Sequence, residues 1–466
     1  MNKPVLALTD FGSTYTKVAL VNSTTGDLLA TAQAPTTVHN DVMVGYRNAV
    51  NRACSVANIP DGQVTSIASS SAGGGLSVGS IGLVDDYTAA AARQAALNSG
   101  AKVDLVISGH LGPEKLNIIN KTNMDVLLFS GGTDGGHTKQ VIANAKLIAG
   151  AIKPCPIIIA CNKDISDVVA TIFCDIGFQV TTTENVLPDI DTMNIDPARR
   201  AINKLFIERV IIGKGLSGAV EFSNTVIMPT PEAVLVATEL LSKGTALQQG
   251  VGDILVIDIG GATTDIHSSL SKPPTRTGFR SRGPGLPTLM RSVQGDLGMR
   301  WNASSVCSQD EAWLKSTLDL DAVSWGQVKN VSEEWELQPH SVIPDESLGS
   351  LIEPLLAISC AAIGIKRHCG KTHAVYIPNQ GVDFIQDGTD FREIALVVGT
   401  GGILIHSPDG TGILDRALER QKAEHTLSPE NAQVQIDSHY IMAAAGLLST
   451  QNPDAALHLM KSTLRL

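Results

Sequence analysis

The residues best suited to chemistry lie in the stretch Asp258-Ile259-Gly260-Gly261-Ala262-Thr263-Thr264-Asp265. The apolar, β-branched run Asp253–Ile257 precedes it and is typical of a buried strand, and an alternating pattern resumes after it. A glycine turn has no Cβ atoms, so its backbone N–H groups can approach phosphate oxygens closely. Short hydroxyl groups on Thr263 and Thr264 suit the same oxygens. The stretch therefore predicts a strand–turn–strand phosphate site in which Gly260 and Gly261 also contact the nucleotide.

A weaker copy of this pattern opens the chain. Val5–Thr9 is typical of a strand, Asp10-Phe11-Gly12-Ser13-Thr14 of a turn, and Tyr15–Leu20 of the returning strand. Asp10 and Asp258 end the first strand of their hairpins, where each could hold a hydrated Mg²⁺ or orient an attacking water. Either hairpin alone could be an ordinary Asp–Gly turn. The two together favour two similar half-domains that bind one nucleotide.

A third glycine turn follows late in the chain. The buried strand Ile394–Val398 ends in Gly399-Thr400-Gly401-Gly402. Glycines leave room for the backbone to pack against an adenine or ribose face. The motif is weak alone and becomes more specific because it follows the two Asp hairpins in the chain. The three turns predict one nucleotide site of three parts.

The composition narrows the class of protein. The chain has 466 residues, of which 43% are hydrophobic and 17% charged, so a large globular core is expected. A net charge of −11 with no basic run argues against nucleic acid as a partner. Seven scattered cysteines favour reduced thiols in a cytoplasmic protein. We expect no signal peptide and no membrane span, since no stretch of 18 apolar residues occurs without charge.

Regular alternation of strands and helices begins near residue 102. The pattern predicts four buried parallel strands with helices between and after them, which favours a flavodoxin-like insertion. The expected strands are Lys102–Ile107, Asp125–Phe129, Pro156–Ala160 and Phe178–Thr182. The expected helices are Pro113–Lys121, His137–Ile152, Ser166–Ile176 and Pro197–Val210.

The glycine-rich loop Gly131-Gly132-Thr133-Asp134-Gly135-Gly136 follows the second of these strands. Ligands bind at the carboxyl ends of strands in open α/β sheets, so Gly131, Gly132, Thr133 and Asp134 form a possible docking loop. The loop could also be a sharp strand-to-helix turn that needs positive φ. After the insertion, a helix is expected over Thr230–Gly244, with Pro231 in its first turn, and an apolar core helix over Glu353–Ile365.

The order of the three turns resembles the phosphate-1, phosphate-2 and adenosine motifs of the actin/Hsp70/sugar-kinase superfamily. The resemblance implies an α/β fold with two ribonuclease-H-like (actin-like ATPase) domains around an inserted flavodoxin-like βα domain, closing over ATP and Mg²⁺. It implies domains over residues 1–100, 101–212 and 213–466. Asp10 and Asp258 would be the catalytic and metal-binding residues. The nucleotide would contact Gly12, Ser13, Thr14, Gly260, Gly261, Thr263, Thr264, Gly399, Thr400, Gly401 and Gly402.

Adding the Gly131 loop and Gly295-Asp296-Leu297-Gly298-Met299-Arg300, the set also resembles the MutL-type (GlmL) accessory proteins of glutamate mutase. That family shares only a name with the mismatch-repair protein. The resemblance implies a chaperone-like reactivating factor whose partner is an adenosylcobalamin-dependent mutase. The insertion lacks the Asp-x-His-x-x-Gly motif of cobalamin-binding domains, because Ser108 precedes Gly109-His110 where Asp is needed. Docking on a mutase subunit is therefore expected rather than corrin binding.

Two other functions stay open at this point. A small-molecule kinase of the same superfamily would need a substrate pocket, and aromatic residues make up only 4% of the chain. A partner-binding scaffold without catalysis would not need both Asp10 and Asp258. Within the segment Arg291–Arg300, the two arginines at its ends could approach phosphate, but the favoured interpretation is a brace that pairs them with Asp296.

Overall fold

The computed structural model describes residues 5–12, 15–36, 42–60, 63–71, 76–213, 226–272, 279–281, 286–318, 324–377, 381–424 and 426–466. The chain divides into two compact units. The first unit contains Met1–Ala237, Gly283–Met290 and Ala443–His458. The second unit contains Thr238–Arg282, Arg291–Met442 and Leu459–Leu466.

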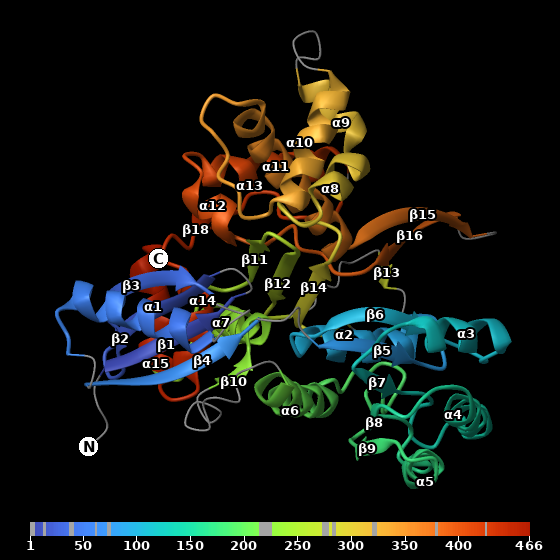
Figure 1. Cartoon of the computed structure of the whole chain (residues 1–466). Coiled ribbons are helices and arrows are strands. Elements are labelled where there is room, and N and C mark those ends of the chain that lie inside the picture. Colours follow the sequence, from blue (N-terminus) through green and yellow to red (C-terminus); the bar gives the residue numbers. More distant parts are fainter. Residues whose placement is uncertain are drawn as a thin grey trace. The chain divides into compact units, whose positions relative to one another are not determined.

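The first unit contains a five-stranded sheet in the order β10-β4-β1-β2-β3 (Figure 1). Its strands are β1 (Val5–Phe11), β2 (Tyr15–Asn22), β3 (Leu28–Pro35), β4 (Val64–Ser70) and β10 (Val226–Pro229). The first three strands run antiparallel as a meander, whereas β4 runs parallel to β1 and β10 parallel to β4. Helix α1 (Val42–Ala57) covers the meander and buries Ala49 and Ala53 in the same core as Leu20 of β2.

The second unit contains a sheet of the same construction, in the order β14-β12-β11-β17-β18. Its strands are β11 (Ile254–Ile259), β12 (Thr264–Ser269), β14 (Leu289–Gln294), β17 (Leu396–Thr400) and β18 (Gln433–Ile436). Strands β11 and β12 form an antiparallel hairpin, and β17 and β18 continue in parallel beside β11. Numbered along the chain, each sheet has the order 3-2-1-4-5. This order confirms the prediction of two ribonuclease-H-like halves.

The insertion forms a third five-stranded sheet, with all pairs parallel, in the order β6-β5-β7-β8-β9. Its strands are β5 (Ser77–Ile81), β6 (Lys102–Ile107), β7 (Val126–Phe129), β8 (Pro156–Ile159) and β9 (Gln179–Thr182). The order 2-1-3-4-5 is that of flavodoxin. The sequence predicted four strands, and the fifth is β5, which precedes residue 101. This sheet therefore begins before the boundary expected at that residue.

Helices cover both faces of the inserted sheet. One face packs against α2 and α6, and the other against α3, α4 and α5 (Figure 1). These helices are α2 (Ala90–Asn98), α3 (Pro113–Lys121), α4 (Lys139–Ala151), α5 (Ser166–Cys174) and α6 (Asp196–Gly213). Both faces are buried, which explains why Val126–Phe129 and Pro156–Ile159 are continuous apolar runs.

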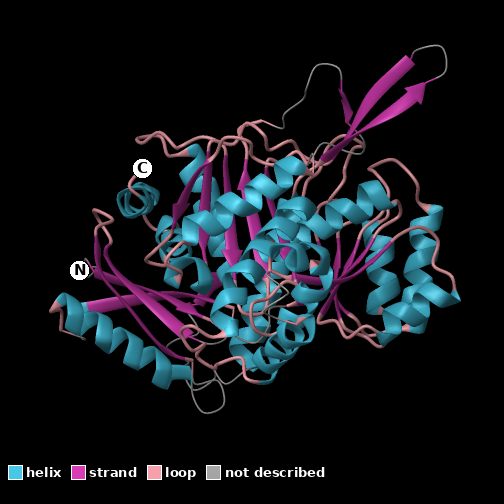
Figure 2. Cartoon of the chain, turned by 90° about the horizontal axis from the view of Figure 1, so that it is seen from above, coloured by secondary structure: helices cyan, strands magenta, loops and turns pink. Residues whose placement is uncertain are grey.

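The remaining α-helices lie outside the inserted sheet. They are α7 (Thr230–Lys243), α8 (Ala303–Gln309), α9 (Glu311–Thr317), α10 (Trp325–Leu337), α11 (Leu348–His368), α12 (Gly402–His406), α13 (Gly410–Ala423), α14 (Ile441–Ser449) and α15 (Pro453–Leu464). A small sheet of β13 (Phe279–Ser281), β16 (Gly381–Asp387) and β15 (Lys371–Ile377) carries a ribbon that extends from the second unit (Figure 2).

Helix α11 is longer than the apolar helix expected over Glu353–Ile365. Within the described part of the chain it is the one helix long and apolar enough to cross a membrane, by length and composition alone. However, 61% of its most apolar window is buried inside the protein. Its buried residues include Ile352, Leu356 and Ile365, as expected of a core helix.

Candidate functional site

Asp10 is the second-last residue of strand β1. Its hydrogen-bond partners were not predicted from the sequence. Thr230, the first residue of α7, donates its hydroxyl to Asp10 Oδ1 at 2.5 Å. Ser69, paired with Asp10 across β1 and β4, donates to the same oxygen at 3.5 Å. Burial raises the pKa of Asp10, while Lys17 on β2 and the two hydroxyls act to lower it. The site thus holds a partly desolvated carboxylate at the end of a strand.

The first glycine turn is tight for a definite reason. The Gly12 N–H donates to Tyr15 O at 3.1 Å, and a Cβ on Gly12 would lie 2.6 Å from that oxygen. Any larger residue would therefore push the turn apart. Ser13 and Thr14, which are predicted to contact phosphate, lie outside the described residues.

Asp258 and the Gly399 turn come together in the second unit. Asp258 of β11 pairs with Asp265 of β12 on one side and with Thr400 of β17 on the other. Gly401 has φ +100°, and a Cβ there would lie 2.3 Å from Ile259 O and 2.9 Å from Asp258 Oδ1. Only glycine fits this position. The predicted phosphate-2 and adenosine turns are therefore neighbours around the Asp258 carboxylate.

The Gly260–Gly261 turn is a hairpin closed by the Gly260 N–H, which donates to Thr263 O at 2.9 Å. The Thr263 hydroxyl donates to Asp265 Oδ2 at 3.2 Å. Thr264 is fully buried, and its hydroxyl donates to Leu297 O at 2.8 Å. A phosphate contact from the Thr264 hydroxyl does not fit this arrangement, because β12 pairing turns that side chain into the core. Thr400 is likewise buried.

The Gly295–Arg300 region packs on this turn. Met299 N–H donates to Gly260 O at 3.1 Å, and Arg300 N–H donates to Gly261 O at 2.8 Å. A Cβ on Gly298 would lie 2.5 Å from Ala262, which explains the glycine. The region supports the backbone of the phosphate-2 turn.

The predicted brace between the arginines and Asp296 is wrong. Asp296 pairs with Arg367 of α11, at 2.8 Å from Nη1 to Oδ1, and this pairing lowers the pKa of Asp296. Arg300 pairs instead with Glu353 at 2.6 Å. Both partners belong to α11, a long-range neighbour that spacing along the chain does not reveal.

Arg291 is a buried cation beside the hairpin. It is 3% exposed and its Nη2 lies 2.9 Å from Asp265 Oδ1. Burial lowers the pKa of Arg291, and the carboxylates of Asp265 and Asp258 oppose that effect. Arg291 therefore supplies a positive charge near the carboxylates of Asp265 and Asp258.

Two further residues that the sequence analysis missed follow strand β18. Asp437 is 1% exposed and accepts the backbone N–H groups of Ile441 and Met442 at 2.9 and 3.0 Å. Tyr440 has φ +55°, and its hydroxyl lies 3.6 Å from where a Cβ of Gly402 would be. Burial and the charges of Asp258 and Asp437 raise the pKa of Tyr440. The non-glycine residue at positive φ was hidden from sequence reasoning, since nothing in Ser438-His439-Tyr440 marks it.

The Gly131 loop follows β7 at the carboxyl edge of the inserted sheet. Gly131, Gly132 and Gly135 have φ of +152°, +69° and +73°. Asp134 Oδ1 accepts from Asn185 Nδ2 at 2.9 Å and from the Lys163 N–H at 3.1 Å. These bonds hold the loop to its neighbours, and the positive φ angles explain its glycines. Its docking role stays a prediction.

Among the described residues no group of three or more His, Cys, Asp or Glu side chains is arranged to hold a metal ion. Mg²⁺ in nucleotide sites usually takes one or two carboxylates together with substrate phosphates and water. Asp10 and Asp258 offer oxygen donors of this kind.

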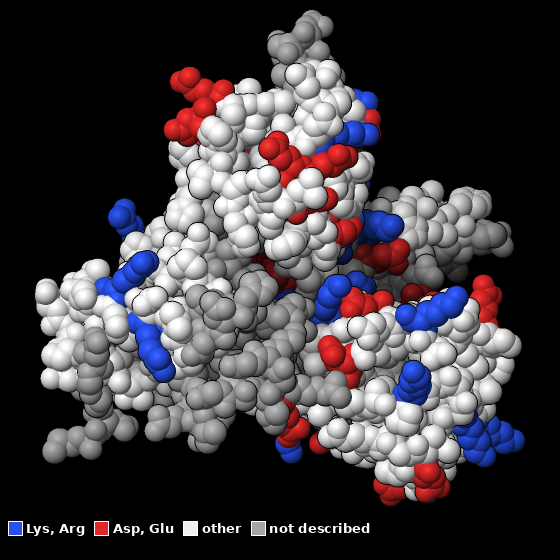
Figure 3. Space-filling model, viewed as in Figure 1, with Lys and Arg blue, Asp and Glu red and all other residues white. Residues whose placement is uncertain are grey.

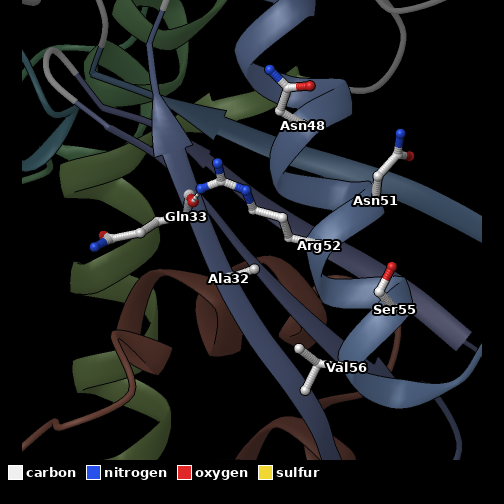
Figure 4. Close-up of a pocket in the computed structure, with 7 residues that line it drawn as sticks. All are labelled: Ala32, Gln33, Asn48, Asn51, Arg52, Ser55 and Val56. Atoms are coloured by element: carbon white, nitrogen blue, oxygen red, sulfur yellow. Dashed lines mark hydrogen bonds between the residues drawn. The ribbon is translucent and has the colours of Figure 1, made fainter.

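A shallow groove of about 710 Å³ lies elsewhere, between β3 and α1 (Figure 4). Gln33 of β3 lines one side, and Asn48, Asn51 and Arg52 of α1 line the other. Arg52 Nη1 donates to Gln33 O at 3.0 Å. None of the predicted nucleotide-binding residues lines this groove.

Two sheets of the order 3-2-1-4-5, each with an Asp-x-Gly motif at the end of its first strand, define an actin-like ATPase fold. A family model described as MutL protein matches residues 6–464. The chain is 37% identical over 465 residues to Protein MutL of Clostridium tetanomorphum, covering 98% of each sequence. The chain belongs to the MutL protein family, as its motifs predicted.

Solved structures with related folds include two of interest. Nucleotide-free acetone carboxylase matches with 15% identity and a TM-score of 0.40, covering 96% of this chain and 70% of that one. A nucleotide-free diol dehydratase-reactivating factor matches with 9% identity and a TM-score of 0.37, covering 96% of this chain and 99% of that one. Likeness at these values says nothing about activity.

Proposed function

We propose that this protein binds and hydrolyses ATP to reactivate an adenosylcobalamin-dependent mutase, such as glutamate mutase or a related aminomutase, by exchanging damaged cobalamin. The observation that carries the proposal is the pair of Asp–Gly hairpins on two sheets of one strand order. Membership of the MutL family supports the choice of partner class. We expect the protein to work in the cytoplasm.

The proposed chemistry needs positioning and electrostatics rather than covalent catalysis, as in other phosphoryl transfers. Backbone N–H groups of the Gly12 and Gly260–Gly261 turns would bind phosphate oxygens. Asp258 would accept a hydrogen bond from the attacking water and orient it toward the γ-phosphorus. Arg291 would place its positive charge near the Asp258 carboxylate.

Asp10 would anchor the waters of Mg²⁺, which neutralises phosphate charge when bound. Thr230 and Ser69 would hold the Asp10 carboxylate in place through their hydroxyl groups. In this proposal the two aspartates have different tasks: Asp10 holds the metal ion, and Asp258 orients the attacking water.

The nucleotide would control the mutase through a population shift between two states of the protein. Inverting a population of about 1:10 needs a hundredfold preference of ATP for one state, or about 2.7 kcal/mol. A few phosphate contacts made in one state alone supply that difference. The inserted domain would grip the mutase, with the loop Gly131–Asp134 as a candidate contact.

The first test is ATP hydrolysis with and without a cobalamin-inactivated mutase, comparing wild type with Asp258→Ala. We expect the mutase to stimulate wild type, and the variant to lose about 10²-fold or more in rate because its water is no longer oriented. ATP binding should persist in the variant, since the turn N–H groups remain. Equal rates for the two proteins would contradict the catalytic assignment. Phosphate release without phosphorylation of added sugars or carboxylic acids would set hydrolysis apart from a kinase reaction.

A further inference from the structure

Four exposed residues of the second unit, Trp301, Leu337, His340 and Val342, are named here the Trp301 patch; His340 contacts Trp301, and Leu337 and Val342 flank His340 along the chain. Trp301 is 51% exposed, Leu337 83% and Val342 89%. The rings of Trp301 and His340 meet edge to face with centroids 6.4 Å apart. Exposed single apolar residues are ordinary, but large ones gathered beside each other mark interaction sites.

The patch is bonded directly to the phosphate-2 turn. The Trp301 N–H donates to Gly261 O at 2.9 Å, and the Arg300 N–H donates to the same oxygen at 2.8 Å. A Cβ on Gly261 would lie 3.9 Å from Trp301 Cδ1, so the indole lies beside the turn. A rearrangement of the Gly260–Gly261 turn must therefore reach Trp301.

Arg300 joins this turn to the helices that carry the rest of the patch. Its Nη2 lies 2.6 Å from Glu353 of α11, and its guanidinium lies 5.0 Å from the ring centroid of Trp335 on α10. Leu337 is the last residue of α10, and His340 and Val342 lie three and five positions after it. The turn and the patch are thus parts of one bonded framework.

The chain around the patch is strongly acidic. Residues 333–353 contain six carboxylates and no Lys or Arg. Glu336 and Glu353 are paired with Ser304 and Arg300. The other four, Glu333, Glu334, Asp345 and Glu346, are exposed. Figure 3 shows acidic side chains at the top of the view, with Lys or Arg side chains beside them at its right edge.

Apolar side chains rimmed by carboxylates are complementary to a segment of the opposite design. Such a segment has apolar residues on one side and Lys or Arg beside them, as in a basic amphipathic helix. A second copy of this chain does not fit, because its net charge is −11 and the same rim would face itself.

We propose that the Trp301 patch docks a basic amphipathic segment of a partner protein, and that ATP bound at the Gly260–Gly261 turn changes the affinity for that segment. By linkage, docking must change the affinity for ATP by the same factor. The identification of the partner as the mutase rests on the proposed function. The docking of a basic amphipathic segment is inferred from the residues of the patch and does not rest on that function.

The surface can be tested with two labelled synthetic helical peptides that share their leucines and carry either Lys or Glu on the polar side. We expect the full chain to bind the Lys peptide and not the Glu peptide. Binding should weaken by about tenfold in Leu337→Ser/Val342→Ser and in Glu333→Lys/Glu334→Lys, because apolar anchors and their charged rim are lost. Asp415→Lys/Glu419→Lys on α13 makes the same charge change elsewhere and should bind like wild type. Equal binding of both peptides, or unchanged binding in the patch variants, would overturn the proposal.

The link to the nucleotide has its own measurement. Saturating ATP with Mg²⁺ should change the dissociation constant of the Lys peptide by about fivefold or more, within the usual range of coupling between sites. An unchanged constant in a chain that binds ATP would overturn the link.

The inactivated mutase is the second probe, and it distinguishes this proposal from the proposed function. If Glu333→Lys/Glu334→Lys reactivates and binds the mutase as well as wild type does, the patch is not the mutase-docking surface, although the proposed function stands. If wild type binds the Lys peptide at the patch but neither binds nor reactivates the mutase, the proposed function fails and the docking surface stands.

Discussion

At the scale of single residues, the Thr230–Asp10 hydrogen bond is the most informative contact of the first unit. Thr230 is the first residue of α7 and lies 220 positions along the chain from Asp10. Burial raises the pKa of Asp10, and this hydrogen bond is one of the groups that lower it again. The bond therefore keeps the carboxylate available in its charged form, which a role in holding Mg²⁺ requires.

Replacing Thr230 with valine keeps the shape of the side chain and removes the donor. A hydrogen bond to a charged group contributes about 1.5–3 kcal/mol, so its loss should raise the pKa of Asp10 further. The acid limb of the ATPase rate–pH profile should therefore move to higher pH. Ser242→Ala, at the far end of α7, removes a hydroxyl that donates to the carbonyl of Ser269 and should leave the profile in place. An unmoved acid limb in Thr230→Val would remove the assigned role of Thr230.

The aspartates at the strand ends could be predicted from local pattern, because each follows an apolar strand and precedes a glycine turn. Their partners could not. Arg291 pairs with Asp265 across 26 residues, and Arg367 pairs with Asp296 across 71 residues. Contacts of this kind depend on how strands and helices pack, and spacing along one sequence carries no signal for them. For the same reason, Thr264 seemed a phosphate ligand although its side chain faces the core.

At the scale of elements, the last turn of α11 anchors the hairpin of the second unit through His368, a partly buried histidine. The two ring nitrogens of His368 lie 2.9 Å from Ser268 Oγ of β12 and 2.8 Å from Ser292 Oγ of β14. The ring stacks on Phe391 at 5.2 Å. Burial lowers the pKa of His368 to about 3, and burial lowers the pKa of His267 as well. Both rings are neutral when the unit is folded.

This burial predicts a loss of stability in acid. Below the ordinary histidine pKa of about 6.5, the unfolded chain binds protons that the folded unit does not, so the free energy of unfolding falls by about 1.4 kcal/mol per pH unit for each such histidine. The loss from His368 continues until the pH nears its folded pKa of about 3. In His368→Gln the slope between pH 6 and 4 should decrease by about one proton.

Tryptophan fluorescence in urea measures this slope. All four tryptophans, at positions 301, 313, 325 and 335, belong to the second unit. His439→Gln, which changes an exposed histidine of the same unit, should keep the wild-type slope. A slope in His368→Gln equal to that of wild type would show that His368 titrates normally.

The type of each sheet could be predicted from the sequence, but the number of strands in the inserted sheet could not. Alternating strands and helices identified the inserted flavodoxin-like sheet, because both of its faces are buried and its strands are continuous apolar runs. Strand β5 fell within the first expected domain, residues 1–100, since nothing in its own sequence tells which strand it will pair with. Its neighbours are β6 and β7, both later in the chain.

At the scale of the whole molecule, two ribonuclease-H-like halves provide the two glycine turns that we propose bind phosphate, and the first unit carries an additional flavodoxin-like sheet. The second unit adds the Trp301 patch, which is bonded to its own turn. A protein that couples ATP binding to partner binding needs a nucleotide site, a conformational state that the nucleotide favours, and surfaces that bind the partner.

The most direct test of the proposed function is recovery of activity by an adenosylcobalamin-dependent mutase inactivated with damaged cobalamin. The inactive mutase is mixed with this protein, free adenosylcobalamin and Mg²⁺, with or without ATP. We predict that activity returns with wild type and ATP, and that Asp258→Ala or omission of ATP leaves the mutase inactive. Equal recovery without ATP, or with Asp258→Ala, would contradict the central claim that hydrolysis at the paired hairpins drives the exchange.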